Sequence, residues 1–118
     1  MGNRREREWQ VTISIRKKGA FCVVSPGGEL SMVEDAARLA QELEVLCNSG
    51  KKRICIDLTD SPVINSRAIG EIVKFHDRLY SDGGELCILN ARNLVLEVLL
   101  HTQIDRVVRI IQSESELD

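Results

Sequence analysis

Residues 53–66 read RICIDLTDSPVINS, and this stretch decides the fold because it joins a short strand to the start of a helix. Arg53–Leu58 has isoleucines on both sides of a cysteine, a pattern typical of a buried strand. Thr59–Asn65 carries Pro62 and predicts a loop, whereas Ser66–Ser81 has apolar residues at helical spacing. When a helix separates one strand from the next in this way, a right-handed crossover and parallel pairing are expected.

Two strands are predicted on the amino-terminal side of this stretch. Val11–Arg16 alternates apolar and polar side chains, as a half-buried strand does. Ala20–Ser25 is a continuous apolar run and predicts a more central strand. Lys18 and Gly19 between them favour a turn, so we expect an antiparallel hairpin.

The first helix is predicted to begin at Ser31, because Ser31 and Glu34 have the spacing of a capping box. Asn48 and the residues after it end the pattern. The apolar residues at helical spacing, expected to face the sheet, are Val33, Ala36, Ala37, Ala40, Leu43 and Cys47. In the second helix the corresponding residues are Ala68, Ile69, Ile72, Val73, His76 and Leu79.

The carboxyl-terminal third continues the alternation of strands and helices. Glu85–Leu89 predicts a buried strand, Asn93–Thr102 a helix apolar enough to be mostly covered, and Val107–Ile111 the last strand. The order predicts an α/β fold: a single domain with a mixed, mostly parallel sheet of about five strands and helices packed against it. We expect the domain to span residues 11–112, after a charged segment at 1–10 and before an acidic tail at 113–118.

Composition excludes several classes of function. The 118 residues are 43% hydrophobic, enough for one core, and carry a formal net charge of −2 with both signs interspersed. This pattern argues against nucleic-acid binding, and no apolar run approaches the roughly 20 residues of a membrane helix. The first eight residues, MGNRRERE, are too charged for a secretory signal. We therefore expect a soluble cytoplasmic protein, a monomer or weak dimer.

The cysteines and histidines do not indicate a metal site. The four cysteines lie in or beside apolar stretches and are Cys22, Cys47, Cys55 and Cys87. No pair has the CxxC spacing of a zinc or redox site, and His76 and His101 are far apart in the sequence. We interpret the cysteines as small buried hydrophobic residues in a reducing compartment, and we expect neither a metal nor a cofactor.

Two patterns that suggest an enzyme fail on physical grounds. Cys47–Arg53, CNSGKKR, matches the Cys-five-residues-Arg spacing of cysteine phosphatases, but Cys47 is predicted at the end of a helix and not at the end of a strand. The dipole there raises a thiol pKa, the opposite of what a nucleophile needs. Asp57 and Asp60 have no nearby histidine or lysine with which to share acid-base chemistry. The sequence therefore predicts a protein that is not an enzyme.

Asn65 and Ser66 stand where the second helix begins, and two explanations are open. Both are preferred helix N-caps, so the structure of the helix end alone could account for them. The alternative is that the serine hydroxyl is an exposed contact point for another protein.

Five segments, in this order and spacing, resemble the STAS domain family over about residues 11–111. They are GGELS at 27–31, ICIDLTD at 54–60, VINSRAIGEI at 63–72, DGGELCILN at 82–90 and LLHTQIDRVVRI at 99–110. The resemblance implies an anti-sigma-factor antagonist, whose partner is a serine kinase that is also the anti-sigma factor. It also implies a serine phosphatase that reverses the modification.

Carried onto this chain, the resemblance implies that Ser66 is phosphorylated and that phosphorylation releases the partner. The binding surface is then expected to comprise Ser61, Asn65, Ser66, Arg67, Glu71 and Lys74. The chain departs from the family pattern where Asn65 replaces an acidic residue, Arg67 a second serine, Ala68 a glycine and Gln103 a helix-ending glycine. The first two departures favour an alternative, an unphosphorylated STAS scaffold or a transporter-associated interaction module.

Overall fold

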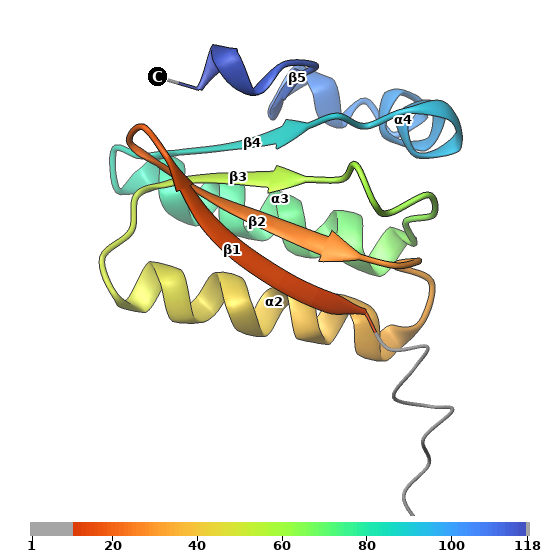
Figure 1. The fold of residues 1–118 in the computed structure, drawn as a ribbon, viewed down its shortest axis with the longest axis horizontal. Helices are drawn as coiled ribbons and strands as arrows, with labels where there is room; N and C mark the ends of the chain where they lie inside the picture. Colours follow the sequence, from red (N-terminus) through yellow and green to blue (C-terminus); the bar gives the residue numbers. More distant parts are fainter. Residues whose placement is uncertain (1–10, 118) are drawn as a thin grey trace, which may run out of the picture.

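A computed structural model describes residues 11–117 as one five-stranded sheet with helices against it (Figure 1). The strands are β1 (Thr12–Lys18), β2 (Phe21–Gly27), β3 (Arg53–Asp57), β4 (Glu85–Leu89) and β5 (Arg109–Ile111). The α-helices are α2 (Val33–Asn48), α3 (Ser66–Ser81) and α4 (Asn93–His101), and two short 3-10 helices are η1 (Ile104–Arg106) and η2 (Glu114–Glu116).

The strands lie in the sheet in the order in which they occur in the chain. β1 and β2 form the predicted antiparallel hairpin, and all later neighbours pair in parallel. The predicted mixed, mostly parallel sheet in a single domain is therefore confirmed. The parallel arrangement brings the carboxyl ends of β3 and β4, and the loops that follow them, to the same edge of the sheet.

The two faces of the sheet are covered differently. Ile54 and Ile56 of β3 belong to the main core, against which α2, α3 and α4 bury their apolar stripes. Cys55 lies between these isoleucines, so it faces the opposite side, where a smaller apolar cluster also contains Val23 and Leu117. We call this second side the outer face. Figure 1 shows α2 and α3 side by side against the opposite face of the sheet.

The first helix begins differently from the prediction. Met32, not Ser31, occupies the N-cap position, and the acid that closes the helix end is Asp35, not Glu34. The Asp35 carboxylate accepts hydrogen bonds from the backbone amides of Ser31, at 3.1 Å, and Met32, at 2.8 Å. Asp35 is not among the residues predicted to face the sheet, but it is buried because it satisfies these two amides.

The buried face of α2 is also rotated from the predicted one. Ala36 and Leu43 are buried as expected, but Leu39 and Leu46, which the prediction omitted, complete the stripe. Val33, expected to face the sheet, is 57% exposed because it lies in the first helical turn, beyond the stripe at 36, 39, 43 and 46.

The last third departs from the prediction in two places. Helix α4 buries only Val95 and Leu99 while Leu94 and Leu100 are about half exposed, so the helix is not mostly covered. Its buried residues are four apart and form a single narrow stripe. The final strand begins at Arg109, not Val107, because the Val108 amide completes the η1 turn by bonding the Ile104 carbonyl at 2.8 Å.

The two ends of the chain bear on the predicted domain limits. The charged segment 1–10 lies outside the described residues. In the segment predicted as an acidic tail, Glu114–Glu116 form η2, and the following residue, Leu117, is fully buried on the outer face. Within residues 11–117, no helix has the length and apolar character that would let it cross a bilayer.

Candidate functional site

The loop that precedes α3 is held against the loop that precedes α2. Leu30 forms a parallel bridge with Ile64, its amide bonds the Val63 carbonyl at 2.9 Å, and its carbonyl accepts from the Asn65 amide at 2.8 Å. Both residues of the bridge are apolar and buried, which fixes the pairing in the core. The amino termini of α2 and α3 are thereby placed next to each other.

Asn65 is the residue that caps α3. Its side-chain oxygen accepts a hydrogen bond from the Ala68 amide at 2.8 Å, and its side-chain amide donates to the Met32 carbonyl at 3.1 Å. The first bond satisfies one of the free amides of the helix end, and the second joins the cap to the start of α2. The capping explanation therefore accounts for Asn65.

Ser66 has a different environment. It occupies the first position of α3 and is exposed, and its hydroxyl has no hydrogen-bond partner among residues 11–117. The backbone amides of Ser66 and Arg67 are likewise without an acceptor in that range, as is usual at a helix N-terminus. Capping therefore does not explain Ser66, whose hydroxyl lies in a region of partial positive charge with no partner from the described part of the chain.

The predicted surface residues that follow lie along one side of α3. Arg67 and Lys74 are exposed, and the Glu71 carboxylate lies 3.6 Å from the Lys74 ammonium. Ser66, Gly70 and Lys74 are four residues apart and form one exposed strip. The structure thus brings together all but one of the predicted surface positions.

Ser61 is the predicted surface residue that is not at the surface. Its side chain is buried, with 1% exposure, and its hydroxyl donates to the Pro26 carbonyl at 3.0 Å. The Ser61 hydroxyl attaches the loop after β3 to the end of β2 and takes no part in the exposed strip.

Met32 and Val33 are residues of this surface that the sequence analysis missed. They are 59% and 57% exposed, and Met32 is hydrogen-bonded to Asn65. Large apolar side chains exposed beside a free polar group are typical of protein-binding surfaces. Their position after the GGELS segment at 27–31 was the available signal, but the predicted helix assigned Val33 to the core.

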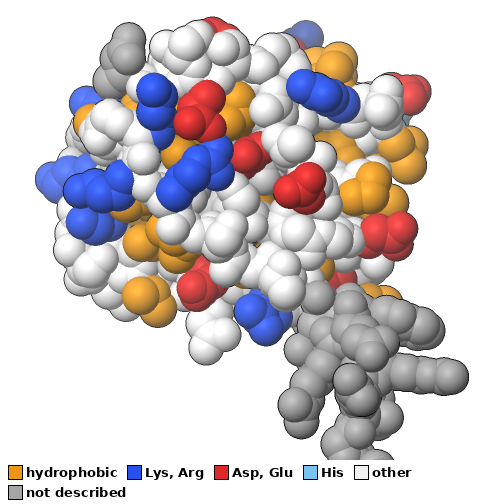
Figure 2. Space-filling model, in the orientation of Figure 1, with side chains coloured by type: hydrophobic (Ala, Val, Ile, Leu, Met, Phe, Trp, Pro, Cys, Tyr) orange, Lys and Arg blue, Asp and Glu red, His pale blue; other side chains and the backbone are white. Residues whose placement is uncertain are grey.

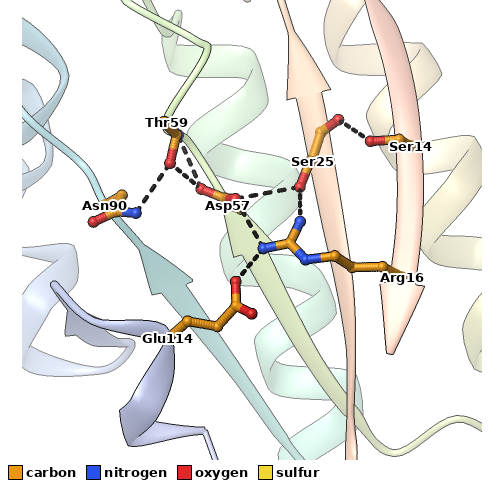
Figure 3. Close-up of polar contacts among 7 residues, drawn as sticks. All are labelled: Ser14, Arg16, Ser25, Asp57, Thr59, Asn90 and Glu114. Atoms are coloured by element: carbon orange, nitrogen blue, oxygen red, sulfur yellow. Dashed lines mark hydrogen bonds and ion pairs between the residues drawn. The ribbon is translucent and has the colours of Figure 1, made fainter. Parts of the chain in front are cut away.

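A polar cluster on the outer face holds the other end of the loop (Figure 3). The Asp57 carboxylate accepts from the Thr59 amide at 3.0 Å and from the Thr59 hydroxyl at 2.5 Å. On its other side, Asp57 lies 3.3 Å from the Arg16 guanidinium, which also forms an ion pair with Glu114. Asn90, after β4, donates to the Thr59 hydroxyl at 3.0 Å. The cluster thus joins β1, β3, the loop after β4 and η2.

The electrostatics of Asp57 follow from these contacts. Burial raises the pKa of the Asp57 carboxyl, but the hydrogen bonds from Thr59 and the charge of Arg16 outweigh burial and lower it overall. Asp57 is therefore held in its ionised form as an anchor for the turn at Thr59. Asp60, which the sequence analysis considered with it, is exposed.

Comparison with known proteins gives a family match. A family model described as STAS domain matches residues 12–117, which is most of the chain. A comparison with curated proteins gives no match.

Several solved structures are similar to this one. TM1081 of Thermotoga maritima, described as a candidate anti-sigma factor antagonist, is 25% identical, with a TM-score of 0.80 over 88% of this chain and 89% of that chain. The phosphorylated form of the Bacillus cell fate determinant SpoIIAA is 14% identical, with a TM-score of 0.69 over 91% and 97%. The murine anion transporter Slc26a9 is 12% identical, with a TM-score of 0.65 over 83% of this chain and 17% of the transporter. The last two show likeness of fold alone.

Proposed function

This chain belongs to the STAS domain family, and from that premise we propose that it is an anti-sigma-factor antagonist that binds a kinase-type anti-sigma factor. In this proposal, phosphorylation of Ser66 ends the binding and a serine phosphatase restores it. The protein acts by binding and not by catalysis, as a cytoplasmic monomer or weak dimer. The observation that carries the proposal is the exposed Ser66, whose hydroxyl has no partner among residues 11–117, beside a residue that already caps the helix.

The proposed binding surface combines the exposed strip of α3 with the apolar start of α2. Its residues on α3 are Ser66, Arg67, Glu71 and Lys74, and the hydrogen bond from Asn65 to the Met32 carbonyl joins this helix to the start of α2, where Met32 and Val33 are more than half exposed. Apolar side chains supply contact area, and the serine hydroxyl can donate a hydrogen bond to the partner. Ser61 is left out because it is buried.

A phosphate on Ser66 is expected to act at the interface and not on the fold. It adds about −1.5 to −2 charges. The helix N-terminus favours such a charge by about 0.3 to 1 kcal/mol, so the domain stays folded. A partner surface that accepted a neutral hydroxyl must instead desolvate the new charge, at a cost of several kcal/mol in binding.

The test compares Ser66→Ala with Ser66→Asp in binding to the cognate kinase-type anti-sigma factor, measured by calorimetry. We expect Ser66→Ala to bind as the wild type does and Ser66→Asp to bind about tenfold more weakly or worse. The matched control is Ser81→Asp, which places the same charge on an exposed serine at the far end of α3. Equal affinities for Ser66→Ala and Ser66→Asp would refute the switch.

Arg67 favours a second candidate, a STAS module that is never phosphorylated and serves as a scaffold or in association with a transporter. An arginine next to a phosphoserine can pair with it and weaken its repulsion of the partner. The likeness of fold to part of Slc26a9 is consistent with this candidate. Incubation with kinase and ATP, followed by intact mass and peptide mapping, separates the two: phosphate on Ser66 supports the switch, and its absence supports the scaffold.

A further inference from the structure

Cys55 and Cys87 are direct neighbours on the outer face. They are register partners in the parallel pair of β3 and β4, and both belong to the same apolar cluster. Paired strands lie about 4.8 Å apart, within the roughly 4.4 to 6.8 Å between Cα atoms that a disulfide requires. Both are free cysteines. Of the other two, Cys22 belongs to the main core on the helix side of the sheet, and the partly buried Cys47 of α2 packs against that core.

The two thiols lie in a row of residues that ends in arginine on both sides. The register places Arg16 of β1 opposite Val23, Val23 opposite Cys55, Cys55 opposite Cys87, and Cys87 opposite Arg109. In the orientation of Figure 2, Lys and Arg side chains gather at the end of the sheet that carries the β1–β2 hairpin. The interaction with Cys55 lowers the pKa of Cys87 against the effects of burial and of the Glu85 charge, and the Arg109 charge lowers it further.

The cover over the thiols comes from the segment 113–117. Every member of the outer apolar cluster lies on a strand except Leu117, which is fully buried there. The segment is fastened by the ion pair of Glu114 with Arg16, two side chains that remain about 40% exposed. An exposed ion pair is worth little, and Leu117 is a single buried side chain, so release of this segment needs less free energy than unfolding of the sheet.

We propose that Cys55 and Cys87 are a reversible oxidation site, a dithiol that hydrogen peroxide converts to a disulfide when the segment 113–117 lifts from the outer face. The proposal is independent of Ser66 and of the proposed partner. It assigns the two thiols a chemical role in place of the purely structural one that the sequence suggests.

The chemistry balances in two steps. The Cys87 thiolate attacks one oxygen of the peroxide; the O–O bond breaks, Cys87 becomes a sulfenic acid, and the hydroxide that leaves takes up a proton to form water. The Cys55 sulfur then attacks the Cys87 sulfur, the S–O bond breaks, and the departing hydroxide leaves as water with the Cys55 proton. Two thiols and one peroxide give one disulfide and two waters, and a thiol reductant reverses the change.

The test uses the full chain with Cys22→Ala and Cys47→Ala, which retains only the proposed pair. Peroxide treatment is expected to remove two hydrogens from the intact mass, and peptide mapping should find Cys55 joined to Cys87 within one molecule. Adding Cys87→Ala should abolish that loss. The same treatment of the urea-unfolded chain confirms that the oxidant is active. An unchanged mass of the folded protein, or disulfides only between molecules, would overturn the proposal.

The role of the cover is tested separately by the rate of oxidation. We expect Leu117→Ala to oxidise at least about tenfold faster, because the buried side chain that holds the segment is lost. Glu114→Gln should oxidise about threefold faster, and Glu116→Gln, an exposed acid in the same turn, should match the parent. If all three variants oxidise at the rate of the parent, the segment does not control access to the thiols.

Discussion

The side-chain oxygen of Asn65 accepts a hydrogen bond from the Ala68 amide at 2.8 Å, so Asn65 and not Ser66 caps α3. This relationship separates the two explanations that the sequence leaves open at this position. The presence of Asn65 is explained by its structural role as the N-cap of α3. Ser66 is the next residue and takes no part in the cap, so its exposed side chain is left for the role that we propose.

Replacing Asn65 with alanine should destabilise the domain by about 1 kcal/mol, because the Ala68 amide loses its acceptor. Asn65→Asp retains a side-chain acceptor and adds a negative charge that is favoured at a helix N-terminus, but it loses the donor to the Met32 carbonyl, so its stability should lie between those of Asn65→Ala and the wild type. Urea unfolding followed by circular dichroism measures both variants. Equal stability of Asn65→Ala and wild type would mean that the cap has no energetic role.

Asp57 should make the stability of the domain sensitive to acid. Its pKa is lowered in the folded state, so its contribution is fully present above the unfolded value of about 3.9 and is lost as the pH falls through the lower folded value. Wild type should therefore be more stable than Asp57→Asn at pH 6, and the two should converge as the pH falls through the lowered pKa of the folded state.

Urea midpoints across this pH range measure the effect for Asp57→Asn, with Asp60→Asn as the matched control. Asp60 is an exposed acid in the same loop. The idea fails if Asp57→Asn parallels the wild type at every pH.

The burial of Leu117 leads us to propose that the folded domain extends beyond residue 112, to the segment 113–117. Leu117→Ala should cost about 2 kcal/mol or more of unfolding free energy, because a fully buried leucine leaves a cavity. The exposed neighbour serves as control, and Glu116→Ala should change stability by less than about 0.5 kcal/mol. If both variants unfold at the same urea concentration, the segment 113–117 is not part of the folded domain.

Two glycines should respond to alanine in opposite directions. A Cβ on Gly84 would lie 2.0 Å from the Lys52 carbonyl oxygen, so Gly84→Ala must move one of two packed backbones and should cost about 3 kcal/mol. A Cβ on Gly70, in the exposed strip of α3, would meet no atom within 4 Å. Gly70→Ala should therefore stabilise the helix by about 0.5 to 1 kcal/mol. Thermal unfolding of both proteins decides the matter.

The sequence predicts the sheet and the start of α3 well because local patterns determine them. The apolar run at 20–25, the isoleucines around Cys55 and the loop with Pro62 each favour one structure, and the fold agrees with them. The capping of α2 was predicted wrongly because Ser31 and Glu34 have the right spacing but the chain uses Asp35. Whether Glu34 or Asp35 faces the protein interior depends on how α2 packs against the sheet.

The candidate site was only partly predictable for the same reason. Ser61 occurs in a polar loop, yet its hydroxyl bonds a carbonyl on β2 that is distant in sequence. Met32 and Val33 belong to another element and reach the surface around Ser66 only through the bridge between Leu30 and Ile64. The polar cluster of Arg16, Asp57 and Glu114 draws on residues up to 98 positions apart. No pattern within a single segment predicts such contacts.

The agreement between strand order and chain order affects how this protein can fold during synthesis. Each strand can pair with the strand that precedes it in the chain, so no strand must be inserted between two that are already paired. A nascent chain emerging from the ribosome can therefore extend its sheet in the direction of translation. Since η2 follows β5 in the chain, the segment that carries Leu117 of the outer apolar cluster is synthesised after the strands that carry Cys55 and Cys87.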